Sequence, residues 1–418
     1  MLHDCHLDYN TPMSRISDRL MTPPRTRDFW VVALTFGAFL AAASVPSPLY
    51  AVYAQEWSFS PALLTAVFAV YAVTLLGTLL TAGSVSDAVG RKPVILAAIA
   101  IQLVAMGAFI VANGLAWLFV ARGLQGLATG LVTGAVAAAL IELQPTGKTG
   151  LGSLVNSITP TVGLALGGLI AGLLVQFGPD PLRLVYVLLL IAFIPCGLGI
   201  AVIPETVRAR NQPKFRPRVA VPRALRPAFV AGLPALIAPW ALGGLWLSLG
   251  PSLLLSMTGS SNRAVAGFVV FLLCISGAVA SFAGRHQQPA RSMLLGCTAL
   301  VLGVSVTGVA VVQSSPVLFL VGTAVAGAGF GTAFLGAFRT LAALADPSSR
   351  GAVISAIYVV AYLAFSIPVV IAGVVATQIG LRPTAIGYVI VVTLVAAAAI
   401  PLARRTSTSR DQTSRHRL

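Results

Sequence analysis

Charged residues are scarce in this chain. Asp, Glu, Lys and Arg together make up only 9% of its 418 residues, whereas hydrophobic residues make up 57%. Soluble globular domains carry about 25% charged residues, and a soluble core of this size could not bury so much apolar surface. The shortage of charge therefore excludes an ordinary water-soluble domain, and we expect the chain to fold within a lipid bilayer.

Residues that bind metals or perform catalysis are also few. His286 is the only one of four histidines away from the chain ends, and the four cysteines show no paired spacing. Three cysteines lie in apolar runs, so neither a metal site nor a disulfide framework is predicted. The sequence also contains no nucleotide-binding loop and no cluster of His, Cys and carboxylate residues. We predict a protein that is not an enzyme and uses no cofactor.

Acidic residues are outnumbered by basic residues, 11 to 27, which gives a net charge of +16. A strongly basic protein can bind nucleic acid, but here the basic residues lie almost entirely between apolar runs. That distribution is typical of topology signals in membrane proteins. We therefore predict no nucleic-acid partner.

Apolar stretches long enough to cross a membrane recur twelve times. A membrane-spanning helix needs about 20 residues, and a lone strand cannot satisfy its backbone hydrogen bonds in lipid. The predicted fold class is an all-α polytopic membrane protein with twelve transmembrane helices in two six-helix halves. The apolar runs lie at 29–53, 61–83, 94–112, 115–140, 151–177, 183–203, 228–257, 264–283, 293–312, 316–344, 351–377 and 383–403.

The longest gap between runs separates the two halves. It contains seven Lys or Arg residues and a single acid, Glu205. The predicted organisation is a disordered tail, an N-terminal half, a basic linker, a C-terminal half and a basic tail, over residues 1–28, 29–203, 204–227, 228–403 and 404–418.

The basic residues also predict an orientation. When successive gaps are assigned to alternate sides of the membrane, 22 of the 27 Lys and Arg residues fall on the side that holds both termini, and three fall on the other. Loops rich in Lys and Arg stay in the cytoplasm. Both termini are therefore predicted to be cytoplasmic.

A repeat with an offset of 201 residues supports two related halves. Gly126 and Gly130 in the fourth run correspond to Gly327 and Gly331 in the tenth. The same offset relates 170–172 to 371–373 in the fifth and eleventh runs, both Ile-Ala-Gly. The same offset of 201 residues thus relates several helices of the first half to helices of the second.

The loop after the second run carries the most informative motif. It extends from Gly83 to Pro93 and contains Asp87, Gly90 and Arg91. This loop resembles the one between helices 2 and 3 of the major facilitator superfamily of membrane transporters, whose pattern is Gly-x-Leu-Ala-Asp-Arg-x-Gly-Arg-Lys. Two positions differ, with Val in place of the Leu and Ala in place of the first Arg.

The resemblance implies that this loop gates the cytoplasmic face. It implies that Arg91 pairs with Glu142 and that Asp87 lies near the start of the eleventh span, where a helix N-terminus favours an acid. The alternative is that Arg91 is an ordinary positively charged anchor and Asp87 a solvated turn residue. The predicted gating residues are Gly83, Asp87, Gly90, Arg91 and Glu142.

The fourth run contains a second resemblance to the same family. Arg122 is followed by Gln125 and Gly126, which matches the helix 4 pattern Leu-x-x-x-Arg-x-x-Gln-Gly. An Arg inside a span is costly unless it faces water or a partner. Arg122 is therefore predicted either to contact substrate or to influence a proton site; the alternative is that its side chain extends to the membrane interface.

The fifth run resembles the Gly-x-x-x-Gly-Pro-x-x-Gly-Gly pattern of the family's drug and proton antiporters. Pro160, Gly163, Gly167 and Gly168 are present, but Leu164 replaces the family's Pro and Thr replaces the first Gly. These residues predict a small-residue face for close helix packing and a bend at the proline. A packing surface and an antiporter signature are equally good interpretations.

No Asp or Glu lies deep inside any apolar run. Proton coupling therefore has no embedded carboxylate to use, and coupling through a peripheral acid and uniport both stay open. The only embedded charge is positive, which favours an anionic or neutral solute over a cation. Candidate residues for substrate binding or coupling are Arg122, Gln125, Tyr50, Asn156, Trp246, Tyr358 and Tyr362.

These observations predict a secondary active transporter that moves a small solute by alternating access. We expect an exporter of small amphipathic compounds; the alternatives are uptake or exchange of a polar or anionic metabolite, and a non-transporting membrane sensor of the same fold. The abundance of Arg, Ala, Gly and Val suggests a bacterial cytoplasmic membrane protein. We expect a monomer in contact with lipid.

Overall fold

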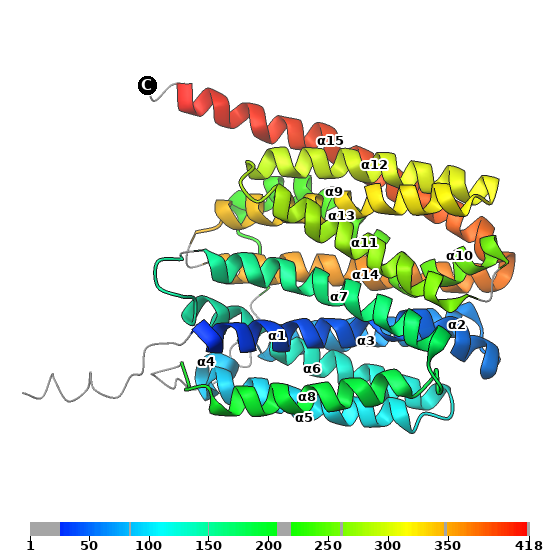
Figure 1. Cartoon of the computed structure of the whole chain (residues 1–418). Helices are drawn as coiled ribbons and strands as arrows, with labels where there is room; N and C mark the ends of the chain where they lie inside the picture. The colour runs from blue at the N-terminus through cyan, green and yellow to red at the C-terminus, as the bar shows by residue number, and fades with distance from the viewer. Residues whose placement is uncertain are drawn as a thin grey trace, which may run out of the picture.

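The structure is a computed structural model that describes residues 26–82, 85–148, 150–206, 219–259, 262–346 and 349–415. Within these residues, twelve helices are long and apolar enough to cross a membrane. They lie side by side in one bundle, and both described ends of the chain emerge at the same end of it (Figure 1). The predicted number of spans is confirmed.

The helices form two groups of six spans. The first group consists of α1 (Thr26–Ser44), α2 (Pro46–Glu56), α3 (Pro61–Ala82), the short α4 (Val85–Val89), α5 (Arg91–Ile110), α6 (Leu115–Glu142), α7 (Leu151–Phe177) and α8 (Leu184–Val202). The second consists of α9 (Arg226–Ser248), α10 (Gly250–Thr258), α11 (Arg263–Ala283), α12 (Pro289–Gln313), α13 (Pro316–Leu344), α14 (Arg350–Ile379) and α15 (Leu381–Arg415). A single 3-10 turn, Arg223–Leu225, precedes α9.

The first span of each half is interrupted at an equivalent place. Helix α1 gives way to α2 at Val45, and α9 gives way to α10 at Leu249. Each interruption is followed by a proline, Pro46 or Pro251, which has no N–H to donate to the helix.

The repeat seen in the sequence is also a repeat of packing. A side chain added at Gly126 or Gly130 would collide with the backbone of α3. In the second half, a side chain at Gly327 or Gly331 would collide with the backbone of α11 in the same way. The fourth span therefore packs closely on the second, and the tenth on the eighth.

The two halves meet along α7 with α11 and along α3 with α14. A Cβ at Gly172 would lie 2.7 Å from the Cα of Gly267, so the backbones of α7 and α11 nearly touch. Between α3 and α14, the backbone N–H of Ala62 donates to Oγ1 of Thr377 at 3.2 Å. These contacts lie where α7 and α14 end and α3 and α11 begin, at the end of the bundle opposite Arg91.

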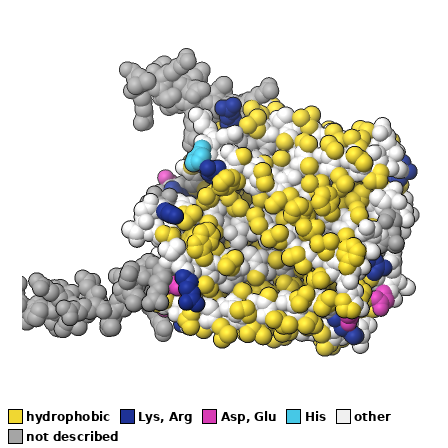
Figure 2. All heavy atoms as spheres, in the orientation of Figure 1, with side chains coloured by type: hydrophobic (Ala, Val, Ile, Leu, Met, Phe, Trp, Pro, Cys, Tyr) yellow, Lys and Arg dark blue, Asp and Glu magenta, His cyan; other side chains and the backbone are white. Residues whose placement is uncertain are grey.

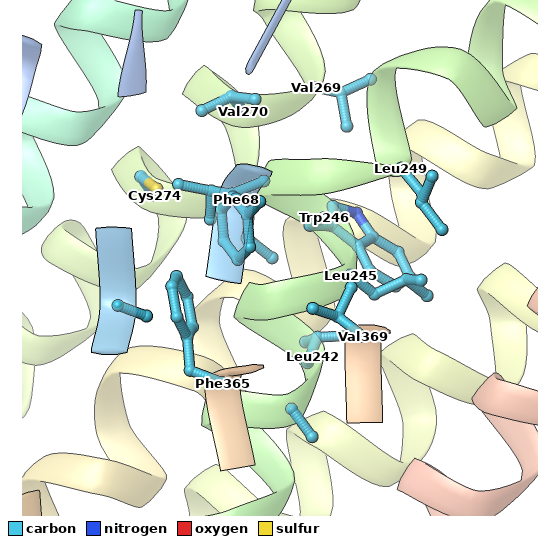
Figure 3. Packing of buried hydrophobic residues seen from close by; sticks show 14 of the residues in the cluster. Phe68, Leu242, Leu245, Trp246, Leu249, Val269, Val270, Cys274, Phe365 and Val369 are labelled. Carbon is cyan, nitrogen blue, oxygen red and sulfur yellow. The ribbon is translucent and has the colours of Figure 1, made fainter. Parts of the chain in front are cut away.

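Near mid-depth, aromatic rings join the halves. The rings of Phe68 in α3 and Phe365 in α14 have centroids 4.9 Å apart (Figure 3). Around them lie buried side chains of α9, α11 and α14, among them Trp246, Cys274 and Val369. This core continues from one half into the other.

The outside of the bundle suits a hydrocarbon environment. Large apolar side chains are exposed on it, including Leu34 at 70%, Val202 at 73% and Val317 at 73%. Apolar side chains cover the middle of the face in Figure 2, and the Lys and Arg side chains lie toward its edges. Helix α15 extends beyond its apolar part, which ends at Pro401, to Arg415.

Candidate functional site

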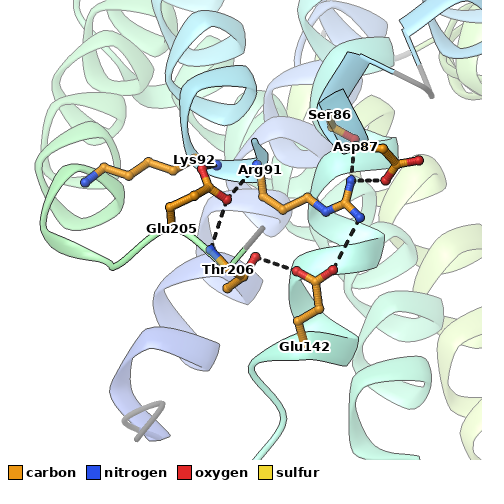
Figure 4. Close-up of polar contacts among 7 residues, drawn as sticks. All are labelled: Ser86, Asp87, Arg91, Lys92, Glu142, Glu205 and Thr206. Carbon is orange, nitrogen blue, oxygen red and sulfur yellow. Dashed lines mark hydrogen bonds and ion pairs between the residues drawn. The ribbon is translucent and has the colours of Figure 1, made fainter. Parts of the chain in front are cut away.

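The loop between the second and third spans folds into a compact charged cluster. Helix α4 places Asp87 one turn before Arg91, and the two side chains form an ion pair. The same guanidinium donates to the hydroxyl of Ser86 at 2.9 Å and pairs with Glu142 on α6 at 3.3 Å (Figure 4). Arg91 therefore holds the loop against the fourth span.

Glu205 is a member of this cluster that sequence reasoning missed. Its carboxylate accepts hydrogen bonds from the backbone N–H groups of Arg91 at 2.9 Å and Lys92 at 3.1 Å. It thereby caps the N-terminus of α5 from a position 114 residues further along the chain. The neighbouring Thr206 hydroxyl donates to Glu142, which closes a ring of contacts (Figure 4). The only available signal was that Glu205 is the sole acid in a basic linker.

Gly90 is required by the geometry of this cap. Its φ of 119° and ψ of 154° lie in a region that essentially only glycine occupies. A Cβ at Gly90 would also lie 2.8 Å from the carboxyl carbon of Glu205. The glycine thus serves both the backbone turn and the approach of the cap.

Two expectations about the loop stay predictions. Gly83 lies outside the described residues, as do residues 207–218 of the basic linker and 1–25 of the N-terminal tail. Asp87 keeps 63% of its side chain exposed, and among the described residues its hydrogen-bond and ion-pair partner is Arg91. It makes no such bond with the described start of α14. The halves are held together at the opposite end instead, which leaves Asp87 open to solvent.

Arg122 is buried in the first half, with 1% of its surface exposed. It donates to the carbonyl of Ala43 at 3.0 Å and to Oε1 of Gln125 at 2.6 Å, and its guanidinium carbon lies 4.3 Å from the ring centroid of Tyr71. None of the three ion pairs among the described residues involves it. Its Nε atom and the hydroxyl of nearby Tyr50 are buried without a hydrogen-bond partner. Within the part of the chain that the structure describes, the charge of Arg122 thus has no carboxylate paired with it.

Gln125 completes a link from the fourth span to the interruption in the first. Because Pro46 lacks an N–H, the carbonyl of Ala42 has no helical donor, and Nε2 of Gln125 donates to it at 2.9 Å. We call the bonds from Arg122 and Gln125 to Ala42 and Ala43 the first clasp. It holds the bent helix where its hydrogen bonding is weakest.

The second half has a counterpart, which we call the second clasp. Adding the repeat offset to position 122 gives Thr323 on α13. Its hydroxyl accepts a hydrogen bond from Nε1 of Trp246 at 3.0 Å, and Trp246 lies just before the interruption at Leu249. Trp246 is only 1% exposed, so in this state its ring is packed inside the second half. The hydrogen-bonding side chains differ between the two halves. In each half, however, they join the fourth span to the region of the interruption in the first span.

Tyr358 and Tyr362 belong to a larger set of rings, which we call the aromatic group. Its members come from α9, α13 and α14 and contact one another edge to face, stacked or tilted; they are Trp240, Phe334, Phe338, Tyr358, Tyr362 and Phe365. Most are half-buried, and Tyr362 packs against Leu75 and Tyr71 of the first half. The group therefore forms an aromatic wall on the second half that faces the first.

Helix α7 carries the remaining predicted site residues. Asn156 is half-buried, and its Oδ1 atom has no hydrogen-bond partner. Pro160 lies within the helix, and beyond it Gly163 and Gly167 lie against the backbone of α1. Gly168 lies against the second half, because a Cβ there would be 2.6 Å from Cγ1 of Val270. The glycines of α7 thus face two different neighbours.

Comparisons with known proteins agree with this architecture. No curated protein sequence matches the chain. A bacterial homologue of the human lysosomal transporter Spinster, in an inward-facing unoccupied conformation, superposes with a TM-score of 0.70 at 15% identity over 92% of this chain and 98% of its own. The nucleoside transporter NupG gives 0.67 at 15% identity over 92% and 99% of the two chains.

A human protein has a similar fold. The organic anion transporter MFSD10 superposes with a TM-score of 0.61 at 18% identity, over 90% of this chain and 100% of its own. These likenesses concern the fold. The sequence model of the Major Facilitator Superfamily matches residues 31–289, which is more than half of the chain. Twelve spans in two related halves, the charged loop and this match together show that the chain is a multi-pass membrane transporter of the major facilitator superfamily.

Proposed function

We propose that this transporter exports small amphipathic compounds from the cytoplasm by alternating access. The observation that carries the proposal is the aromatic group on the second half. Flat aromatic surfaces bind compounds with a large apolar part without requiring a particular pattern of hydrogen bonds. The half-buried amide of Asn156 and the unpaired Nε1 of Trp240 can orient a polar end of the same compound.

The charged cluster supplies the proposed gate, and we place it at the cytoplasmic face. Its ion pairs are partly solvent-exposed, with 63% exposure for the Asp87 side chain and 35% for Glu142. Such pairs contribute about 0.2–1 kcal/mol each, which is weak enough to break and re-form during a transport cycle. In the state described here Asp87 pairs with Arg91 and keeps 63% of its side chain exposed, so it can also meet the start of α14 when this face closes.

The location and coupling follow from the same proposal. A bacterial cytoplasmic membrane, cytoplasmic termini and a monomeric unit are consistent with the distribution of basic residues and with two complete halves in one chain. Since no carboxylate lies deep in a span, proton coupling would use a peripheral acid such as Glu56 or Glu142. Uniport is the alternative mode.

A whole-cell efflux assay tests export. Cells that lack their own broad-range exporters would be loaded with neutral, cationic and anionic fluorescent amphipathic dyes, with and without the expressed protein. We expect faster dye loss from expressing cells, and at least tenfold slower loss with Trp240→Ala. Trp117→Ala is the matched control, because Trp117 is a 41% exposed tryptophan outside the aromatic group. Equal efflux by the two variants would refute the aromatic group as the binding surface.

A second candidate is transport of a polar organic anion. The specific observation in its favour is the unbalanced charge of Arg122, together with the unpaired Tyr50 hydroxyl beside it. A carboxylate or phosphate would satisfy both groups once α1 moves away. Uptake of labelled dicarboxylates and sugar phosphates into proteoliposomes, compared between the wild type and Arg122→Gln, would distinguish this candidate from dye export.

A further inference from the structure

Two grooves flank the first half of α15, on the outside of the bundle. The groove shared with α9 and α14 has a volume of about 460 Å³ and includes Pro368, Gly387 and Val391 in its lining. The groove shared with α12 has a volume of about 420 Å³ and includes Ser305, Gly308 and Leu394. Both lie in the half of the membrane opposite the charged cluster, where α12 ends and α15 begins.

The lining of both grooves is suited to hydrocarbon. In the α9 groove, the Tyr388 hydroxyl donates to the carbonyl of Ala241 at 2.7 Å and so offers no free donor. The α9 groove is open because its lining includes alanines and Gly387 in place of larger side chains. A Cβ at Gly387 would meet no atom within 4 Å. Val391 and Leu394 are 59% and 64% exposed, so the walls face the surrounding lipid.

A cationic side chain lies at the outer end of α15. Arg382 donates from Nε to the carbonyl of Val311 at 3.1 Å and from Nη2 to that of Val312, which fixes the guanidinium against the end of α12. Val312 also lines the α12 groove, and Pro383, which follows Arg382 in the chain, lines the α9 groove. None of the three ion pairs among the described residues includes Arg382.

We propose that an anionic phospholipid straddles the start of α15, with its phosphate on Arg382 and one acyl chain in each groove. A phosphate matches the forked donors of a guanidinium, and Arg382 has its charge at the level of the lipid head groups. The two grooves diverge from this point along opposite sides of one helix, as the two chains of a phospholipid do from its glycerol. The lipid thereby fills the space between α15 and its neighbours.

Native mass spectrometry of the full-length protein tests the head-group contact. The protein would be purified from phosphatidylglycerol-containing membranes and titrated with phosphatidylglycerol or phosphatidylcholine. We expect Arg382→Gln to weaken phosphatidylglycerol binding about fivefold, which corresponds to about 1 kcal/mol for one basic residue, and to leave phosphatidylcholine binding unchanged. Arg263→Gln is the matched control, since Arg263 begins α11 at the same end of the bundle. Equal loss in the two variants would overturn the proposal.

The acyl-chain contact has its own test, which begins with the wild-type protein. Wild-type protein would be irradiated with phosphatidylglycerol that carries a photoreactive group on either chain, and the labelled peptides would be mapped. Label in both 305–313 of α12 and 368–379 of α14 is expected, because each segment lines one groove only. The first should be lost in Ser305→Leu and the second in Gly387→Leu. Label confined to other helices, or unaffected by these groove-filling changes, would refute the site.

Discussion

The cap on α5 makes a quantitative prediction about Gly90 and Glu205. Glu205→Ala removes a carboxylate that accepts from the N–H groups of Arg91 and Lys92 at 2.9 and 3.1 Å. Loss of an N-terminal cap costs about 0.5–2 kcal/mol, and loss of the negative charge at the helix end adds about 0.3–1 kcal/mol. We therefore expect the single variant to be destabilised by about 1–3 kcal/mol.

Gly90→Ala is destabilised for two separable reasons. A non-glycine residue in this backbone region costs about 1–3 kcal/mol. In addition, its Cβ would lie 2.8 Å from the Glu205 carboxyl carbon, so the cap has to move away. The second cost vanishes when residue 205 is already alanine. The double variant should therefore be more stable than the sum of the single effects by about 1 kcal/mol.

These free energies of unfolding are measured by titrating the purified protein with denaturant in detergent. Glu56→Ala provides the control, because Glu56 is an exposed acid that ends α2 at the other end of the bundle. Glu205→Gln is a milder probe that retains one acceptor oxygen. Strict additivity of Gly90→Ala and Glu205→Ala would show that the glycine is not needed for the approach of the cap.

Three further predictions concern the gate, the second clasp and the contact between halves. Asp87→Asn should lower transport at least fivefold while changing stability by less than about 1 kcal/mol; proteoliposome flux measures this, and Asp180→Asn, at an exposed ion pair on the opposite face, should leave transport intact. Thr323→Val should cost about 0.6–1.5 kcal/mol by loss of one hydrogen bond, and Trp246→Phe should cost more because it also leaves a cavity at a buried position. The double variant should cost less than the sum of the two; additive losses in thermal unfolding would refute the clasp. Gly267→Leu should force α11 away from α7 and increase labelling of cysteines placed at the end opposite the charged cluster. Unchanged labelling would contradict the close contact.

Much of the fold could be predicted from the sequence because spans are long and the bilayer demands continuous apolar runs. Most predicted boundaries lie within about four residues of the observed helices, and 151–177 and 316–344 coincide with α7 and α13. The interruption at Leu249 was missed because a single proline after a glycine is common in membrane helices. The structure shows it as the turn at Leu249 between α9 and α10.

The candidate site was less accessible to sequence reasoning. The pairing of Arg91 with Glu142 was expected from the family resemblance, and the structure brings the two side chains to 3.3 Å. The role of Glu205 depends on a contact across more than a hundred residues, for which the local sequence has no signal. Trp240 was missed in favour of Trp246, because composition alone does not tell which face of a buried helix each tryptophan occupies.

The near contact of Gly172 with Gly267 has a mechanical consequence. Side chains that interlock would have to separate before two helices could tilt, whereas two bare backbones can roll on each other. Since an α-helix rises 1.5 Å per residue, this region of α7 lies roughly 25–30 Å from the start of the helix, and a rotation of roughly 10° would move that start by roughly 5 Å. We therefore expect these glycines to be the pivot of the motion, at which a small roll at one end of α7 produces a wide opening beside the charged cluster.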